Sequence, residues 1–449
     1  MNVDPKIFKA YDIRGTVPDQ LNEEIAYKIG RAFVRVVKAQ RVVVGHDMRV
    51  SGPMLYDALT RGITDEGADV LTIDRCATDI YYYACATTNA AGVMITASHN
   101  PKQYNGFKMV REMPYLLSGD EGIQDIRHLV EANQFGAPTH RGEIKSLDVR
   151  EGFVNKILSL IDVKELKPLK VVIDAGNGMG GVMADLVYEK LPIEVVRLYF
   201  EPDGTFPNHG GDPLIAANRA ELEKRVVSEG AHCGFAFDGD ADRFFSVDDR
   251  GQFVPGDFMT ALLAREILKK QPGSKIIYDL RASHAVPDII RENGGTPLMN
   301  RVGHAYIKRR MKDEDAVFAG EVTGHYYFRD FFCADSGLIP SLRVLEMLSR
   351  HNCKLSDLLK PLEEHYFISG EINVPLESDA EKTAKLTHLE EKYGDAKLLH
   401  MDGLSVEYPD WHFNVRPSNT EPLLRLNLEA RTPEMMCQKR DEVLAIIKG

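Results

Sequence analysis

The sequence has few cysteines, and their spacing indicates neither a zinc site nor a redox pair. Its 449 residues include six cysteines, and none of them forms a C-x-x-C pair. A zinc ribbon or a redox dithiol is therefore not expected. Scattered, reduced core thiols are typical of a cytoplasmic protein, which is where we expect this chain to act.

Long apolar runs and an excess of basic residues are also missing. No segment approaches the roughly 18 consecutive apolar residues that a membrane span needs, and the first residues lack the apolar stretch of a signal peptide. The net charge is −12, without runs of Lys and Arg, so we expect no nucleic-acid partner and no membrane partner. An acidic chain can still bind an anionic small molecule where Arg, Lys and backbone N–H groups cluster.

The chain contains the apolar residues for several cores. Hydrophobic residues make up 44% and charged residues 27%, which are ordinary values for a globular protein, and the length suggests about three or four domains. Short apolar runs alternate with helical spacing in three successive cycles. The predicted strands are 41–45, 69–73, 92–96, 170–174, 194–199, 233–237, 275–278, 296–299 and 316–319, and the predicted helices are 53–66, 80–88, about 180–190, 217–229, 257–270, 283–293 and 304–312.

The last part of the chain has a different pattern. Here strand-like segments are grouped together. One lies at 367–374, before a predicted helix at 379–393, and three more extend to about residue 428, before a predicted helix at 434–448. Alternating strands and helices predict α/β domains with mixed, mostly parallel sheets, whereas grouped strands predict an α+β domain. We therefore expect three related α/β domains at 1–143, 144–251 and 252–364 and a C-terminal α+β domain at 365–449.

The segment T-A-S-H-N-P at 96–101 follows a predicted buried strand, where α/β sheets place their sites. Its small, polar and turn-forming residues suit a loop that exposes the hydroxyl of Ser98, although a plain strand-ending turn has the same composition. Adjacent side chains of an extended backbone point to opposite faces, so we do not expect His99 to complete a catalytic triad with Ser98.

The segment D-G-D-A-D-R at 238–243 also follows a predicted buried strand. Its carboxylates, from Asp238, Asp240 and Asp242, alternate and would project to one side of an extended loop. They would repel one another unless a hard cation such as Mg²⁺ bound them. An EF-hand is excluded, because Arg243 and Asp249 stand where its loop needs Gly and Glu. The plain alternative is a solvated acidic turn.

Two further segments carry polar side chains that suit a phosphorylated sugar. In G-E-V-T-G-H, residues 320–325, Glu321, Thr323 and His325 would share a face of extended backbone and could bind sugar hydroxyls. In R-P-S-N-T-E-P, residues 416–422, an Arg with nearby hydroxyls and turn N–H groups could bind a phosphate. Each segment alone is also compatible with an ordinary exposed strand edge or turn.

A glycine-rich turn offers a competing function. Segment 176–181 reads G-N-G-M-G-G and matches the G-x-G-x-x-G fingerprint, and Glu201 follows the next strand near where a ribose-binding acid would stand. An NAD-dependent dehydrogenase is therefore the alternative from another class. Against it, the fingerprint lies in the second cycle and leaves the other four motifs unexplained, so we favour a tight turn before a helix.

Together the motifs resemble those of the α-D-phosphohexomutase superfamily, most closely its phosphomannomutase/phosphoglucomutase branch. YDIRG, TASHNP, NGFK, DGDADR, GEVTGH and RPSNTEP occur in the family's order over nearly the whole chain. The resemblance implies four domains around a central cleft. It implies interconversion of hexose 1-phosphate and hexose 6-phosphate through phosphorylated Ser98, with Mg²⁺ as cofactor and hexose 1,6-bisphosphate as intermediate and activator.

The resemblance also implies residue roles. The implied catalytic residues are Ser98, Arg14, His99, Lys108, Arg243 and His304; the substrate-binding residues are Tyr11, Arg281, Arg301, Gly303, Glu321, Thr323, His325, Arg416, Ser418, Asn419 and Thr420; and the metal ligands are Ser98, Asp238, Asp240 and Asp242. Two positions depart from the family pattern. Arg281 stands where a Lys is expected, and Val322-Thr323 replaces the Met-Ser of many relatives but keeps the hydroxyl.

The expected partner is a small phosphosugar, and the expected assembly is a monomer or a weak homo-oligomer. A protein that binds phosphosugars without turnover is the alternative that is not an enzyme.

Overall fold

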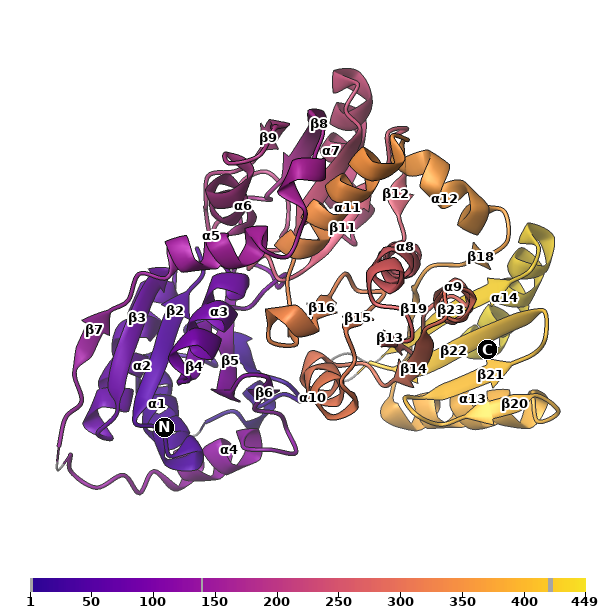
Figure 1. The fold of residues 1–449 in the computed structure, drawn as a ribbon. Helices are drawn as coiled ribbons and strands as arrows, with labels where there is room; N and C mark the ends of the chain where they lie inside the picture. The colour runs from indigo at the N-terminus through magenta and orange to yellow at the C-terminus, as the bar shows by residue number, and fades with distance from the viewer. Residues whose placement is uncertain (1–2, 139, 419–422) are drawn as a thin grey trace. The chain divides into compact units, whose positions relative to one another are not determined.

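The computed structural model describes residues 3–138, 140–418 and 423–449. Its chain forms two compact units. The first comprises residues 1–254, 303–318 and 323–355, and the second comprises 255–302, 319–322 and 356–449. Figure 1 shows the course of the chain through the sheets and helices of each unit.

The first sheet of the first unit has seven strands, in the order β1-β5-β4-β2-β3-β7, with β6 paired to β5. Its centre is parallel, whereas β5 runs antiparallel to both β4 and β1. Strand β7 pairs with β3. This strand lies beyond residue 143, where we expected the first domain to end. The elements are β1 (Ile13–Thr16), α1 (Glu23–Val37), β2 (Arg41–His46), α2 (Gly52–Asp65), β3 (Asp69–Arg75), α3 (Thr78–Thr88), β4 (Ala91–Ile95), β5 (Tyr104–Glu112), β6 (Tyr115–Leu116), α4 (Ile123–Ala132) and β7 (Ile144–Ser146).

Apolar faces of α1, α2 and α4 share one core with this sheet. Helix α1 begins where the Asn22 side chain accepts a hydrogen bond from the Ile25 N–H, and two glutamates in its first turn suit the helix dipole. Strand β2 buries three consecutive valines, as expected for a central strand covered on both faces. The strands and helices predicted for this part of the chain are confirmed within a few residues.

The second sheet, also in the first unit, has the order β12-β11-β10-β8-β9. Strands β9, β8 and β10 are parallel, and β11 turns back antiparallel to β10. The elements are α5 (Arg150–Leu158), β8 (Leu169–Asp174), α6 (Gly180–Tyr188), β9 (Ile193–Leu198), α7 (Ala216–Glu229), β10 (Cys233–Phe237), β11 (Phe244–Val247) and β12 (Phe253–Val254).

The third group of elements is divided between the units. In the second unit β13 and β14 are parallel, and in the first unit β16 and β17 are antiparallel. The elements are α8 (Gly256–Lys270), β13 (Lys275–Asp279), α9 (Ala285–Glu292), β14 (Thr296–Asn300), α10 (His304–Glu314), β15 (Phe318–Gly320), β16 (Tyr326–Phe328), β17 (Ala334–Asp335) and α11 (Leu338–His351).

The last sheet is antiparallel, in the order β18-β23-β22-β21-β20, with β19 also paired to β23. The elements are α12 (Leu355–Glu363), β18 (Phe367–Ile368), β19 (Ile372–Pro375), α13 (Asp379–Lys392), β20 (Lys397–Leu399), β21 (Leu404–Glu407), β22 (Trp411–Pro417), β23 (Leu423–Ala430) and α14 (Pro433–Lys448). The single strand predicted at 367–374 is two strands, separated around Gly370 with its φ of 67°. Among the described residues, four strands, not three, follow α13.

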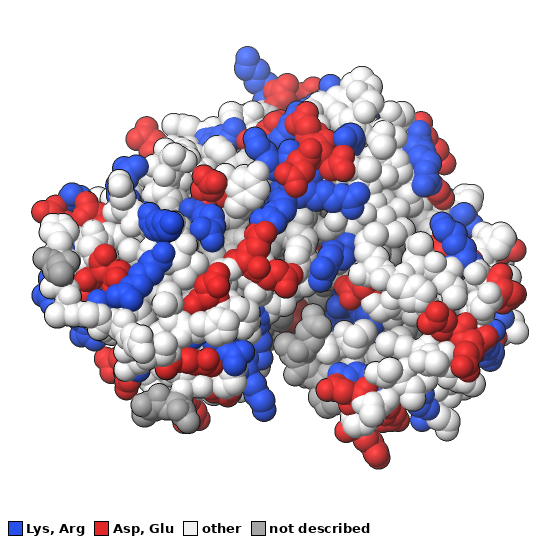
Figure 2. All heavy atoms as spheres, turned by 90° about the horizontal axis from the view of Figure 1, so that it is seen from below, with Lys and Arg blue, Asp and Glu red and all other residues white. Residues whose placement is uncertain are grey.

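None of the six cysteines, which all lie among the described residues, forms a disulfide. Four are buried, but Cys353 is partly exposed and Cys437 is exposed, so the prediction of core thiols is wrong for these two. None of the helices in the described part of the chain is long and apolar enough to cross a bilayer. On the face drawn in Figure 2, acidic and basic side chains are interspersed, so the acidic excess does not form a single patch there.

Helices α1 and α2 cross at glycines, which gives a first prediction. A Cβ on Gly62 would lie 2.1 Å from the Tyr27 carbonyl oxygen. Gly62→Ala should therefore lower the free energy of unfolding by about 1–3 kcal/mol through overpacking, although alanine normally favours a helix by about 1 kcal/mol. Urea denaturation followed by circular dichroism would measure this. Gly136→Ala is the control, since nothing lies within 4 Å of its Cβ; equal stability of the two variants would contradict the prediction.

Candidate active site

The segment 96–101, here called the serine loop, follows β4. The Ser98 N–H donates to Thr96 Oγ1 at 2.9 Å, and the φ of Ser98 is 49°, a left-handed conformation that non-glycine residues adopt rarely. Such backbone strain is common at functional sites. Ser98 is only 2% exposed, so the prediction of an exposed hydroxyl is wrong: the side chain turns inward.

The serine loop is held by Arg49, a residue that the sequence analysis missed. Nη2 donates to the carbonyl oxygens of Ser98 and Asn100 at 2.7 and 2.6 Å, and Nη1 donates to those of Pro101 and Tyr104 at 2.9 Å. Asp47 lies 3.2 Å from Arg49 Nε, and both side chains are fully buried. Burial raises the pKa of Asp47 and lowers that of Arg49, while their mutual attraction opposes both shifts.

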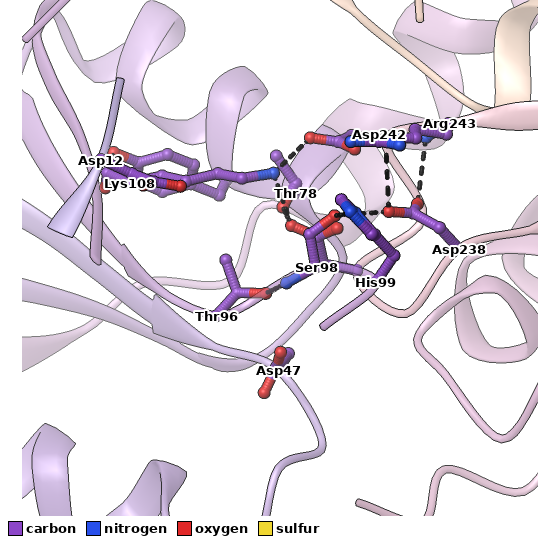
Figure 3. A network of polar contacts seen from close by, with 12 residues as sticks. Asp12, Asp47, Thr78, Thr96, Ser98, His99, Lys108, Asp238, Asp242 and Arg243 are labelled. Carbon is purple, nitrogen blue, oxygen red and sulfur yellow. Dashed lines mark hydrogen bonds and ion pairs between the residues drawn. The ribbon is translucent and has the colours of Figure 1, made fainter. Parts of the chain in front are cut away.

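The aspartate loop, residues 238–243, follows β10 and meets the serine loop. Ser98 Oγ donates to Asp238 Oδ2 at 2.5 Å (Figure 3). A Cβ on Gly239 would lie 2.5 Å from the Ser98 carbonyl oxygen, so only glycine allows this approach. Residues 239–241 form a turn, and Ala241 has a φ of 65°. The predicted extended loop is therefore wrong, but the carboxylates still converge.

Lys108, on β5, neutralises part of this acidic group. Its Nζ lies 2.7 Å from Asp240 Oδ2 and also contacts Asp242. Burial disfavours the ammonium, but the neighbouring aspartates outweigh it and raise the pKa of Lys108. Thr78 Oγ1 donates to the same Asp240 oxygen at 2.8 Å. Despite burial, these partners hold the pKa of Asp240 well below its usual value.

Among the three carboxylates of the loop, the negative charge of Asp238 is balanced least by neighbouring groups. Burial, together with the charges of Asp240 and Asp242, raises its pKa well above the usual value. The Arg243 N–H donates to Asp238 Oδ1 at 3.2 Å, and the Arg243 side chain lies 3.8 Å from Oδ2. Burial opposes the charge of Arg243, but the aspartates raise its pKa nonetheless.

His99 lies beside the serine hydroxyl, contrary to the sequence expectation. Its Nδ1 is 3.2 Å from Ser98 Oγ. The expectation assumed an extended backbone, whereas the left-handed conformation at Ser98 turns both side chains to one side. Burial and the nearby Arg243 and Arg14 hold the pKa of His99 well below its usual value. Arg14, on β1, contacts Asn100 and Asp12, which places it at the same loop.

The aspartate loop fits a hard divalent cation. Each of the three carboxylates offers an oxygen within 4.8 Å of the others, and the Oδ1 atoms of Asp240 and Asp242 are buried without a hydrogen-bond partner. Buried, unpartnered carboxylate oxygens are costly, and Mg²⁺ prefers oxygen ligands and keeps positions open for phosphate oxygens.

The segment 320–325 does not form the predicted extended face. Residues 322–324 form a turn, and Gly324 has a φ of 84°, so Glu321, Thr323 and His325 do not alternate along one strand. Glu321 is buried at 2% exposure and belongs to the second unit. In the first unit, His325 Nδ1 lies 2.9 Å from Asp335 Oδ2 and 3.9 Å from Asp242 Oδ1, which places it beside the aspartate loop.

The predicted helix start at His304 is confirmed. Gly303 precedes α10 with a φ of 131°, and a Cβ there would lie 2.7 Å from the Tyr11 ring. The rings of Tyr11 and His304 have centroids 5.7 Å apart. Burial and the nearby Lys308 hold the pKa of His304 well below its usual value. Arg301 is exposed, in the second unit.

The second unit contains a separate group of arginines around Glu371. Arg281 lies 3.2 Å, Arg425 3.3 Å and Arg416 3.8 Å from this carboxylate. Arg281 also forks onto Asp279, through Nη2 at 2.8 Å and Nε at 3.1 Å. Burial and Arg281 lower the pKa of Arg416, and the Nε atoms of Arg416 and Arg425 are buried without a partner.

The predicted phosphate-binding segment begins within this group of arginines, at Arg416. Ser418 is buried and its N–H donates to the Leu423 carbonyl oxygen at 3.0 Å. Asn419 and Thr420 lie outside the described residues. Arg281, the departure from the family's Lys, is buried against two carboxylates, one of which, Asp279, also accepts a hydrogen bond from the Val322 N–H at 2.9 Å.

The glycine-rich turn 176–181 has a packing role. The Met179 N–H donates to the Gly239 carbonyl oxygen at 2.9 Å, and a Cβ on Gly178 would lie 2.6 Å from that oxygen. Its glycines therefore let the turn pack directly against the aspartate loop, which supports a tight turn before α6 over a dinucleotide site.

Four sequence models of one family match the chain. They describe phosphoglucomutase/phosphomannomutase alpha/beta/alpha domains I, II and III and the C-terminal domain, at residues 5–137, 151–251, 255–366 and 371–446. A phosphomannomutase of Escherichia coli K12 is 41% identical over 447 residues, which cover 97% of each chain. Phosphohexose mutases of Xanthomonas campestris are 42% identical over 446 residues, covering 98% of this chain and 99% of theirs.

A solved structure agrees with these matches. A phosphoglucomutase/phosphomannomutase family protein of Burkholderia thailandensis superposes with a TM-score of 0.90 at 35% identity and covers 99% of this chain and 98% of its own. The fold class predicted from the sequence, three α/β domains and a C-terminal α+β domain, is confirmed.

The chain is therefore a member of the phosphoglucomutase/phosphomannomutase family, within the phosphohexomutases. It is an enzyme of the isomerase class, an intramolecular phosphotransferase.

The second prediction concerns Arg49. A lysine cannot reproduce the guanidinium fork that reaches four carbonyl oxygens, so Arg49→Lys should lower the free energy of unfolding by about 2–4 kcal/mol and reduce mutase activity. Denaturant titration and a coupled mutase assay would measure both. Arg41→Lys is the matched control, because Arg41 donates to one carbonyl at an exposed position. Unchanged activity and stability in Arg49→Lys would show that the loop holds without the fork.

Proposed function

We propose that the chain interconverts hexose 1-phosphate and hexose 6-phosphate, with mannose or glucose as the sugar. The proposed route passes through phosphorylated Ser98 and a hexose 1,6-bisphosphate, which also serves as activator by priming the serine. The observation that supports it best is the contact of 2.5 Å between Ser98 Oγ and Asp238 Oδ2. This contact joins a potential nucleophile to a loop of three buried carboxylates.

Asp238, Asp240, Asp242 and the phosphate on Ser98 would hold Mg²⁺. A bound Mg²⁺ neutralises charge on phosphoryl oxygens. Phosphoryl transfer depends mainly on positioning and charge neutralisation, and Lys108 and Arg243 contribute positive charge at the same place.

In the first half-reaction a sugar hydroxyl attacks the phosphorus of phospho-Ser98. The new bond joins phosphorus to the sugar oxygen, and the bond between phosphorus and Ser98 Oγ breaks. The net proton movement is from the sugar hydroxyl to Ser98 Oγ. Reversal of the steps, with the bisphosphate in its other orientation, returns the second phosphoryl group to Ser98. Arg14, His99 and His304 would line this transfer site.

The remaining residues would bind the parts of the substrate that do not react. Arg416, Ser418, Asn419 and Thr420 would bind the second phosphate, and Arg281, Arg301, Tyr11 and Gly303 would line the substrate. Glu321, Thr323 and His325 would contact sugar hydroxyls. Glucose and mannose differ only at C2, so contacts to O3 and O4 would accept both sugars.

The third prediction tests the serine. Ser98→Ala removes the oxygen that is proposed to carry the phosphoryl group, so turnover of mannose 1-phosphate and glucose 1-phosphate should fall below detection in a coupled assay primed with glucose 1,6-bisphosphate. The wild-type chain should turn over at least one of them. Serine phosphorylation, followed by mass spectrometry, should disappear with the activity. Wild-type rates in Ser98→Ala would refute the route, and binding without turnover by the wild type would favour the silent phosphosugar-binding alternative.

The fourth prediction tests the metal site. Asp240→Asn removes one charged ligand, and the activity should fall about 100-fold or more, as is common when charge stabilisation in an active site is lost. EDTA should inactivate the wild type, and added Mg²⁺ should restore it. The exposed Asp148, changed to Asn, is the control and should keep full activity. Full activity of the wild type in excess EDTA would contradict the metal role.

A further inference from the structure

A group of histidine and glutamate side chains in the second unit has no part in the function proposed so far. Glu407 lies on β21, His412 on β22 and Glu429 on β23. The register of these antiparallel strands places Glu407 opposite His412, and His412 opposite Glu429. Residues directly opposite on neighbouring strands share a face of the sheet, so the three side chains stand side by side.

His284, the N-cap residue of α9, covers these three side chains. Its ring is parallel to that of His412, with the centroids 3.8 Å apart and an angle of 3° between the planes. Its Nε2 lies 3.1 Å from Glu407 Oε2, and its backbone N–H donates to Glu429 Oε1 at 3.2 Å. The start of α9 is therefore in contact with all three strands.

Two ion pairs between histidine and glutamate would explain only part of this arrangement. His412 Nε2 lies 3.4 Å from Glu429 Oε1, but this nitrogen makes no hydrogen bond to any described residue, and neither does Glu429 Oε2. The two residues are only 7% and 4% exposed. Buried polar atoms without a partner are costly, so ion pairs alone do not account for these two atoms.

The types of side chain indicate what would bind them. His284, His412 and Glu429 each offer one ligand atom, and these atoms lie within 4.8 Å of one another. Two imidazoles and one carboxylate are a known ligand set for Zn²⁺, with a fourth position left for water. Imidazole nitrogens suit Zn²⁺ and similar transition metals, whereas Mg²⁺ prefers oxygen ligands.

We propose that His284, His412 and Glu429 form a binding site for Zn²⁺ that is separate from the aspartate loop. Glu407, at Nε2 of His284, stands where a carboxylate commonly orients a metal-binding histidine. The bound ion would join the start of α9 to β22 and β23. The proposal does not depend on the proposed function, because none of these residues is assigned to it.

The stacked rings must separate for the ion to bind. A metal ion lies close to the plane of each imidazole that binds it, and parallel rings in contact do not point to one common place. The side chain of His284 is 27% exposed and that of His412 is 10% exposed. His284 is therefore the ring that can tilt towards solvent, and Zn²⁺ would replace the ring stacking by coordination.

Calorimetric titration of the full, untagged chain with Zn²⁺ tests the site. The chain is first stripped of metal with a chelator and then kept in excess Mg²⁺, so that the aspartate loop is occupied. The wild type should bind one Zn²⁺ per chain. His412→Gln removes a ligand and should lower the Zn²⁺ affinity about 100-fold or more, whereas Glu407→Gln disturbs only the orientation of His284 and should lower it about 10–100-fold.

His400→Gln is the matched control. His400 belongs to the same unit and lies 3.1 Å from Glu390, but both side chains are exposed, so the variant should keep the wild-type Zn²⁺ affinity. Wild-type affinity in a folded His412→Gln, or no binding of Zn²⁺ by the wild type in excess Mg²⁺, would overturn the proposal.

A second variant covers the case in which His412→Gln does not fold. His284→Gln changes a partly exposed side chain and should lose Zn²⁺ affinity to the same extent, and an unchanged affinity would also refute the site. Co²⁺ provides a spectroscopic check, because its visible absorption bands should appear in the wild type and vanish in His284→Gln. Zn²⁺ binding by a chain without mutase activity would refute the proposed function and leave the metal site standing.

Discussion

The mutual repulsion of Asp238, Asp240 and Asp242 is the constraint on which the first unit depends. All three are buried at the end of β10, where unpaired carboxylates would be strongly destabilising. The unit meets this with groups from three other segments, which are Lys108 from β5, Thr78 at the start of α3 and the hydroxyl of Ser98. Within the loop itself, the N–H and side chain of Arg243 add to them. The aspartate loop thereby ties together parts of the chain up to 162 residues apart.

The same constraint determines the form of the serine loop. Its carbonyl oxygens are held from behind by Arg49, so its hydroxyl faces the carboxylates. The two loops can approach only because position 239 has no side chain, and the glycine-rich turn at 176–181 packs against Gly239 because position 178 has no side chain. The glycines of this segment, which resemble a dinucleotide fingerprint, are thus explained by its close packing against the aspartate loop.

Much of the architecture and the position of the site could be predicted from the sequence, because both depend on local patterns. Buried strands such as β2 and β10 are continuous apolar runs, and polar loops follow them directly. What failed depended on single backbone angles. The positive φ values of Ser98, Ala241 and Gly324 turn segments that read as extended into turns, so Ser98 points inward, His99 joins it, and the face predicted for 321, 323 and 325 does not form.

The residues that could not be identified from the sequence are charged residues whose roles depend on being buried. Arg49 and Glu429 lie in no distinctive motif, and a lone Arg or Glu is by far most often exposed. The signal that could have found Arg49 is its place two residues after Asp47, at the end of β2, but an Asp-x-Arg spacing is common in surface loops. Only the folded chain shows that these charges are enclosed and which groups they face.

The charged groups of the two units are balanced in opposite ways. In the first unit, carboxylates are in excess and the ammonium groups of Lys108 and Lys308 lie among them. In the second, Arg281, Arg416 and Arg425 are in excess and Glu371 lies among them. Each unit therefore pairs only part of its own buried charge, because carboxylate oxygens of Asp240 and Asp242 and the Nε atoms of Arg416 and Arg425 stay without a hydrogen-bond partner among the described residues. The excess that remains has the sign that attracts a cation in the first unit and an anion in the second, which agrees with the Mg²⁺ and phosphate sites that we propose for the two units.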